Sequence, residues 1–175
     1  RLVDDRNVRE LCVGLPGVER QHRGLHHGGE AHLRVAVAGI ESGPLGAGEG
    51  ELAMLDLAGL PFRAKDRNMN HPLIIAGGPC TCNPEPVADF FDAIVVGDGE
   101  KVILEMSQAW LTWKARGGRD KKTLLRNWSH IEGVYIPLFF KPKYDENGFQ
   151  SLVPEFSDHI TVKRAIVNDL DHAAF

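Results

Sequence analysis

The chain has 175 residues, enough for one domain with a modest core. Its net charge of −4 predicts no basic face, so we expect no nucleic-acid partner. No run approaches the roughly 18 to 20 apolar residues that span a bilayer, and we expect no membrane partner. The three cysteines, Cys12, Cys80 and Cys82, form no disulfide framework and favour a reducing compartment, so we expect a cytoplasmic protein.

Residues 1–50 differ from the rest in composition. All 13 aromatic residues lie at Phe62 or later, whereas residues 1–50 hold 10 of the 19 glycines and four of the eight histidines. Aromatic side chains anchor cores, so this segment is poorly equipped to fold alone. Two interpretations stay open. It is either a flexible, Gly-rich region with one strand over residues 33–40, or the translation of a wrong reading frame.

From residue 51 onward, short apolar runs alternate with glycine-rich loops. Residues 51–58 predict the end of an amphipathic helix, which Gly59 and Pro61 stop. Residues 72–76 and 93–96 are apolar runs that predict two buried strands. Each leads into a tight loop, with the sequences Gly77-Gly78-Pro79 and Gly97-Asp98-Gly99-Glu100.

Residues 101–116 predict a helix after the second loop. Its apolar side chains recur at helical spacing: Val102, Met106, Ala109 and Trp113, with Ile103 and Trp110 beside them. Asp98 is a candidate N-cap, and Glu100 suits the first turn of the helix. Strand, loop, strand, loop and helix in this order are typical of an α/β fold with a Rossmann-like open parallel sheet.

The second half of the chain adds a β-hairpin extension. Residues 120–128 predict a short basic helix, and residues 133–137 read as a strand. The Asn147-Gly148 pair predicts a hairpin turn between residues 138–144 and 149–153. A last strand is expected within residues 161–167.

The two glycine loops form the candidate site. Loops that follow neighbouring parallel strands emerge at one edge of the sheet, where open α/β sheets bind ligands. Glycines let the backbone approach a ligand closely, and helix starts offer free N–H groups to anions. We therefore select the following residues as candidates for cofactor binding: Gly77, Gly78, Pro79, Asn83, Glu85, Gly97, Asp98, Gly99 and Glu100.

The stretch HPLIIAGGPCTCNPEPVADFFDAIVVGDGE, with MLDLAGLPFRAKDR before it and GVYIP after it, resembles the N-terminal B12-binding-like domain of a family of radical SAM proteins. The resemblance covers roughly residues 52–175 and fails over residues 1–50. It implies three parts: residues 1–50 as an anomalous segment, residues 51–133 as a partial B12-binding-like Rossmann domain, and residues 134–175 as a hairpin and a linker. The expected partner is a radical SAM barrel of the same parent chain, which would begin beyond Phe175.

The resemblance also implies cofactors. The barrel of such proteins binds a [4Fe-4S] cluster, and the cluster binds S-adenosylmethionine. The three-cysteine spacing Cys-x-x-x-Cys-x-x-Cys is absent here, so both are expected only in the missing barrel, and this chain by itself is expected to be inactive. Cobalamin is the ligand expected of this domain, although the motif Asp-x-His-x-x-Gly is absent. The alternative is a non-catalytic α/β interaction domain that has lost cofactor binding.

Simpler roles compete for several residues. Cys80 and Cys82 make an incomplete metal site and are expected to be small buried side chains. Trp110 and Trp113 lie at helical spacing and fit a core better than a ligand stack. Asn83 and Glu85 are expected to brace their loop. The basic residues Arg116, Arg119, Lys121, Lys122 and Arg126 are expected to form a solvated helix face.

Overall fold

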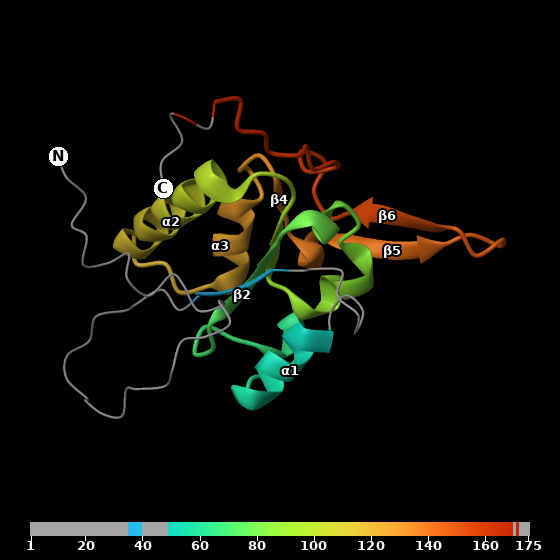
Figure 1. The fold of residues 1–175 in the computed structure, drawn as a ribbon, viewed down its shortest axis with the longest axis horizontal. Helices are drawn as coiled ribbons and strands as arrows, with labels where there is room; N and C mark the ends of the chain where they lie inside the picture. Colours follow the sequence, from blue (N-terminus) through green and yellow to red (C-terminus); the bar gives the residue numbers. More distant parts are fainter. Residues whose placement is uncertain (1–34, 40–48, 170, 172–175) are drawn as a thin grey trace.

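A small mixed sheet organises the α/β fold seen in the computed structural model, which describes residues 35–39, 49–169 and 171 (Figure 1). Its strands follow one another in chain order within the described residues: β1 (Val35–Gly39), β2 (Leu73–Gly77), β3 (Ala93–Val95) and β4 (Val134–Tyr135). β1 pairs in parallel with β2, and β2 with β3. The two buried strands, and the strand predicted within residues 33–40, are thereby confirmed. Of the segment 1–50 that was predicted to be anomalous, residues 1–34 and 40–48 lie outside the described residues.

The fourth strand corrects the prediction of a parallel sheet. β4 runs antiparallel to β3, with Tyr135 opposite Ile94. Two successive helices, α2 (Gly99–Ala115) and α3 (Lys121–Trp128), separate these strands. A single crossover helix would carry the chain to the end of the sheet at which β3 begins, so that the next strand would run parallel. Two successive helices carry it back to the end at which β3 finishes, so that β4 runs antiparallel. The sheet is therefore mixed.

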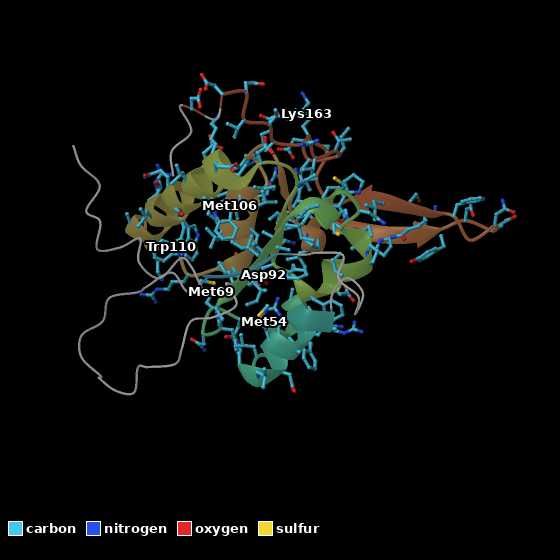
Figure 2. The ribbon with its side chains drawn as sticks, in the orientation of Figure 1. Met54, Met69, Asp92, Met106, Trp110 and Lys163 are labelled. Atoms are coloured by element: carbon cyan, nitrogen blue, oxygen red, sulfur yellow. The ribbon has the colours of Figure 1, made fainter. Side chains whose placement is uncertain are left out.

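The core lies between this sheet and the two helices. Leu73, Ile74, Ile75 and Ala76 are all buried, so both faces of β2 are covered. The apolar stripe of α2 is confirmed, because Val102, Met106, Trp110 and Trp113 are buried (Figure 2). The fully buried indole of Trp128 donates a hydrogen bond of 2.9 Å to the carbonyl of Met106 and joins α3 to α2.

Short helical segments fill the connections. Helix α1 (Glu49–Leu57) ends before Gly59, as predicted. Four 3-10 segments follow it: η2 (Ala64–Asp66), η3 (Pro79–Cys82), η4 (Glu85–Phe90) and η5 (Pro137–Phe139). Segments η3 and η4 connect β2 to β3, and they form one side of the site described below.

The predicted hairpin is confirmed and extends away from the rest of the molecule (Figure 1). Strands β5 (Phe140–Tyr144) and β6 (Gln150–Pro154) pair antiparallel. Asp145 Oδ1 closes the turn by accepting hydrogen bonds from the amides of Asn147 at 2.8 Å and Phe149 at 2.9 Å. The strand predicted within residues 161–167 is reduced to one parallel bridge between Ala165 and Gly97, because a single position pairs with the sheet.

Candidate functional site

The two glycine loops do emerge at one edge of the sheet. β2 and β3 are parallel neighbours, and the Gly77-Gly78 loop and the Gly97–Glu100 loop follow their ends. Gly78 has a φ of 106° and Gly97 a φ of 103°, a region that favours glycine. The predicted site assumed that the two loops share one edge of the sheet, and the structure agrees with that assumption.

The second loop, however, is covered by the chain itself. Ala165 donates its N–H to the carbonyl of Val96 at 2.9 Å and accepts from the amide of Asp98 at 3.0 Å. A Cβ built on Gly97 would lie 2.2 Å from the carbonyl oxygen of Ala165. A Cβ on Gly133 would lie 2.7 Å from the Cβ of Ala165. The glycine at position 97 therefore makes room for the backbone of Ala165, which occupies the space beside this residue, whereas nothing lies within 4 Å of a Cβ built on Gly99.

Asp98 takes part in the same contact. It lies at the N-cap position of α2, as predicted, but its carboxylate makes no capping hydrogen bond. Instead, Asp98 Oδ2 accepts from the amide of Val167 at 2.7 Å. Glu100 lies in the first turn of α2, where the helix dipole favours a carboxylate.

Glu85 is held by residues that are distant in the sequence. The hydroxyl of Tyr135 on β4 donates a short hydrogen bond to Glu85 Oε1, and the amide of Gln150 on β6 donates to Oε2 at 3.1 Å. Burial raises the pKa of the Tyr135 hydroxyl above its usual range, and the charge of Glu85 raises it further. Tyr135 therefore stays a donor at any physiological pH. The expectation that Glu85 braces its loop is supported, because it ties η4 to β4 and to the hairpin.

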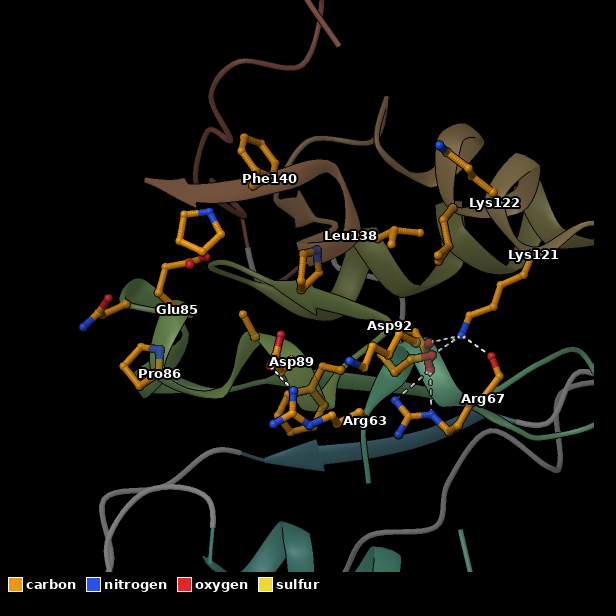
Figure 3. A pocket seen from close by; sticks show the side chains of 18 of the residues that line it. Arg63, Arg67, Glu85, Pro86, Asp89, Asp92, Lys121, Lys122, Leu138 and Phe140 are labelled. Atoms are coloured by element: carbon orange, nitrogen blue, oxygen red, sulfur yellow. Dashed lines mark hydrogen bonds and ion pairs between the residues drawn. The ribbon is translucent and has the colours of Figure 1, made fainter. Parts of the chain in front are cut away.

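Glu85 and Asn83 also line a cavity of about 810 Å³ between the hairpin and the core (Figure 3). The hairpin contributes an apolar and aromatic wall, with Phe140, Pro142 and Tyr144, and Pro137 and Leu138 precede it. The other wall carries Arg63, Arg67, Asp89, Asp92, Lys121 and Lys122. None of the predicted glycines lines this cavity, so the structure separates the predicted site residues into two groups.

A buried ion network forms the floor of the cavity. The side chains of Arg67 and Asp92 are fully buried and lie 3.2 Å apart, and the ammonium of Lys121 lies 2.5 Å from Asp92 Oδ1. Asp92 Oδ2 also accepts from the amide of Ile74 on β2 at 2.8 Å. Figure 2 shows Asp92 near the centre of the molecule. A buried charge is stable only when it is paired in this way.

All hydrogen-bond donors of the two cations in this network are already in use. Arg67 donates to Asp92 and to the carbonyls of Pro61, Phe62 and Phe90, which uses its guanidinium donors. Lys121 donates to the carbonyls of Ala64 and Arg67, at 2.9 and 3.0 Å, besides its contact with Asp92. The network therefore fixes the shape of the floor, and its two cations have no donor left for a ligand.

Sequence reasoning missed this network and the pairing of Tyr135 with Glu85. Arg67 and Asp92 are 25 residues apart, and Tyr135 and Glu85 are 50 apart. The sequence did hold one indication of the buried network: Asp92 is a charged residue directly before the apolar run 93–96. A carboxylate in that place needs a cation from elsewhere in the chain.

The basic residues of the second half do not form one solvated face. Lys121 binds Asp92, Lys122 lies 2.5 Å from Glu155, and Arg126 lies 2.5 Å from Asp158. Arg126 also stacks over the ring of Phe156, 4.2 Å from its centroid. Through these contacts α3 holds residues 155–158 against the core. The expectation of a solvated face was wrong for Lys121 and Arg126, whose side chains are largely covered, whereas Lys122 is exposed.

Two cysteines lie on η3, next to the first glycine loop. Cys80 is half-buried, but Cys82 is exposed, which corrects the expectation that both are buried. Among the described residues no group of three or more histidine, cysteine or carboxylate side chains could hold a metal ion. A [4Fe-4S] cluster takes more thiolates than this neighbouring pair offers, so these residues do not fit it.

No helix in the described part of the chain is long and apolar enough to cross a membrane. The model of one protein family, described as radical SAM proteins, N-terminal, matches residues 50–137, which is half of the chain. The match begins in α1 and ends at the start of η5, so it covers the strands β2 to β4 and the helices α2 and α3. No curated protein matches the chain, and no solved structure matches it.

Proposed function

The chain belongs to the radical SAM proteins, as their N-terminal domain, and we propose that it serves as an accessory domain that binds a ligand for a separate catalytic domain. The family resemblance implies an iron–sulfur cluster that would bind S-adenosylmethionine. The described residues of this domain do not fit the cluster, and in this proposal the cluster would be held by a separate catalytic domain. What this chain contributes is a place to bind.

The observation that carries the proposal is the cavity beside the hairpin. Its volume of about 810 Å³ lies within the range of roughly 300 to 1,000 Å³ that is usual for small-molecule sites. One wall of the cavity is apolar and aromatic, and a few polar side chains face the cavity from the other side. This is the usual composition of small-molecule sites. The saturated network of Arg67, Asp92 and Lys121 keeps the cavity in shape without a ligand.

We propose that the partner is a radical SAM barrel of the same parent chain. Apolar side chains in the segment that follows the hairpin support this: Ile160 is 60% exposed and Ile166 is 64% exposed. A contact with another domain would remove these two apolar side chains from water. Residues 134–175 would then connect the two domains, and residues 51–133 would form the binding unit.

Cobalamin is the second candidate ligand. The parallel strands β2 and β3, with their glycine loops at one edge, favour it. Cobalamin binding there would require residues 164–167 to leave the turn at Gly97. The candidate residues Gly77, Gly78, Pro79 and Asn83 would take part in such binding without that displacement.

The test is to locate the binding surface by NMR on the 15N-labelled chain. A library of small, partly apolar compounds should shift the amides of cavity residues, and Leu138→Ala, which removes part of the wall, should weaken binding about fivefold. The matched control is Leu111→Ala, which trims a partly exposed leucine of α2 outside the cavity and should change nothing. Absence of any shift in the cavity would contradict the proposal.

A second arm of the same test uses hydroxocobalamin under anaerobic conditions. Retained corrin absorbance, with shifts around Gly77 and Gly97, would favour the cobalamin alternative. Loss of the absorbance on gel filtration would contradict the cobalamin alternative and favour a domain that has lost this cofactor.

A further inference from the structure

We propose that Glu85 is the recognition group of the cavity, and that the ligand it selects carries a positively charged amine on an apolar body. This inference rests on the proposed function, because it names the class of ligand for the same cavity. It follows from the charge balance of the cavity, from the way Glu85 is held, and from the wall beside it.

The charge balance singles out Glu85. Asp89 pairs with Arg63 at 3.1 Å, and Asp92 pairs with Arg67 and Lys121. Asp120 caps α3, where its carboxylate accepts from the amide of Thr123 at 2.7 Å. Among the described residues, Glu85 has only neutral donors, Tyr135 and Gln150. It is the carboxylate of the cavity that neither pairs with a cation nor accepts a hydrogen bond from a helix amide, although it lies in the first turn of η4.

Tyr135 and Gln150 fix the direction of this charge. Tyr135 is only 4% exposed, and its ring packs 4.8 Å from that of Phe140, so the hydroxyl cannot swing away. With one donor on each oxygen, Glu85 keeps a second lone pair on each for a ligand. A half-buried carboxylate in this state gains most from a ligand that brings the missing positive charge.

The neighbouring wall suits an organic cation. Gln150 and Tyr144 are paired across the hairpin, and Phe140, Pro142 and Tyr144 alternate along β5 so that they line the cavity. Aromatic faces attract cations as well as apolar groups. The amine is therefore expected to lie at Glu85 and its apolar body along the hairpin.

An anionic ligand has less to bind. The cations of the opposite wall are paired, since Arg63, Arg67 and Lys121 bind aspartates of the cavity and Lys122 binds Glu155. Figure 3 shows Lys121 and Lys122 on the side of the cavity away from Glu85. Lys65 has no carboxylate partner among the described residues, but it is exposed to water.

The test compares three probes that share one body: 4-phenylbutylamine, 4-phenylbutan-1-ol and 4-phenylbutanoate. Their dissociation constants are measured from amide shifts of the 15N-labelled chain at pH 7. The amine should bind at least about tenfold more tightly than the alcohol, and the carboxylate should bind most weakly.

Variants then assign the preference to Glu85. Glu85→Gln keeps the shape of the side chain and should remove the advantage of the amine over the alcohol. Glu105→Gln removes the same charge from α2, outside the cavity, and should keep it. Tyr135→Phe leaves the carboxylate but removes its donor, so it should reduce the amine-to-alcohol ratio while alcohol binding changes little. A merely structural role for Tyr135 would weaken all three probes alike.

The outcomes separate this inference from the proposed function. Equal binding of the three probes, or a preference for the carboxylate, would overturn the inference while leaving the cavity a binding site. The same holds if Glu85→Gln keeps the amine preference. Failure of every probe and library compound to shift cavity residues would overturn the proposed function as well.

Discussion

Among single residues, Asp92 has the largest structural task. It lies directly before β3 with its side chain fully buried, and it binds the guanidinium of Arg67, the ammonium of Lys121 and the amide of Ile74. These partners come from the segment before β2, from the start of α3 and from β2 itself. One carboxylate thus joins the two halves of the domain under the cavity.

Replacing Asp92 by alanine should destabilise the domain by about 3 to 5 kcal/mol, because the largely buried cations Arg67 and Lys121 would lose their negative counter-charge. The measurement is the free energy of unfolding from urea titration. The control is Asp89→Ala, which breaks the pair with Arg63, where the side chains are 73% and 53% exposed. That change should cost less than about 1 kcal/mol. Equal losses for the two variants would show that the buried network contributes no more than a surface pair.

At the scale of elements, residues 164–167, called here the returning segment, lie against the sheet without forming a strand. It joins the sheet at one position, next to Gly97, and contributes no strand of its own. It can lie there because Gly97 and Gly133 both lack a Cβ at the points where Ala165 approaches. The same contact covers the loop that the sequence marked as a ligand site.

The variant Gly97→Ala should displace this segment. Gly148→Ala is the matched control, since its φ is also positive, at 82°, but nothing lies within 4 Å of its Cβ position. The control should cost about 1 to 2 kcal/mol for the backbone alone. Gly97→Ala should cost at least about 1 kcal/mol more, because the clash with Ala165 adds to the strain. Hydrogen exchange at the amides of Asp98 and Ala165 should accelerate in Gly97→Ala only, and unchanged exchange there would contradict the contact.

Across the whole molecule, the hairpin and the returning segment are joined to the core through α3 and His159. His159 is 6% exposed and packs on Phe140, with ring centroids 5.2 Å apart. Burial lowers the pKa of His159, and the positive charges of Arg126 and His130 lower it further, whereas Asp158 raises it. The folded protein therefore holds this imidazole neutral.

This shift predicts a pH dependence of stability. Because the folded pKa is lowered, the unfolded chain binds the proton more readily, and the contribution of His159 is complete only above the unfolded pKa of about 6.5. Stability should fall as the pH drops from 7.5 to 5. In His159→Leu the fall should be smaller, since the remaining titrating groups are shared by the two proteins. The check is the difference in urea midpoint between the two pH values, and an identical difference in both proteins would refute the assignment.

Local patterns were sufficient for most elements. Met106 and Trp113 lie on the same face of one helix, seven residues apart, and the Asn147-Gly148 pair is a turn signal by itself. Helix α2 and the hairpin could therefore be predicted from residues that are neighbours in the sequence. The strands β2 and β3 could also be predicted locally, because each is an apolar run that ends at a glycine. The shared edge of their loops followed from parallel pairing, which short apolar runs favour.

The site could be predicted only in part, for a physical reason. Glu85 was selected from its loop, but its partners Tyr135 and Gln150 lie 50 and 65 residues away, and no spacing rule links them. Hydrogen bonds and ion pairs depend on where side chains meet in space, whereas helix and turn propensities depend on neighbours along the chain. The sequence by itself therefore determined the family, the α/β character and the hairpin. Only the tertiary structure decided that the loop at Gly97 is covered and that the open cavity lies at Glu85, because both depend on how distant segments pack.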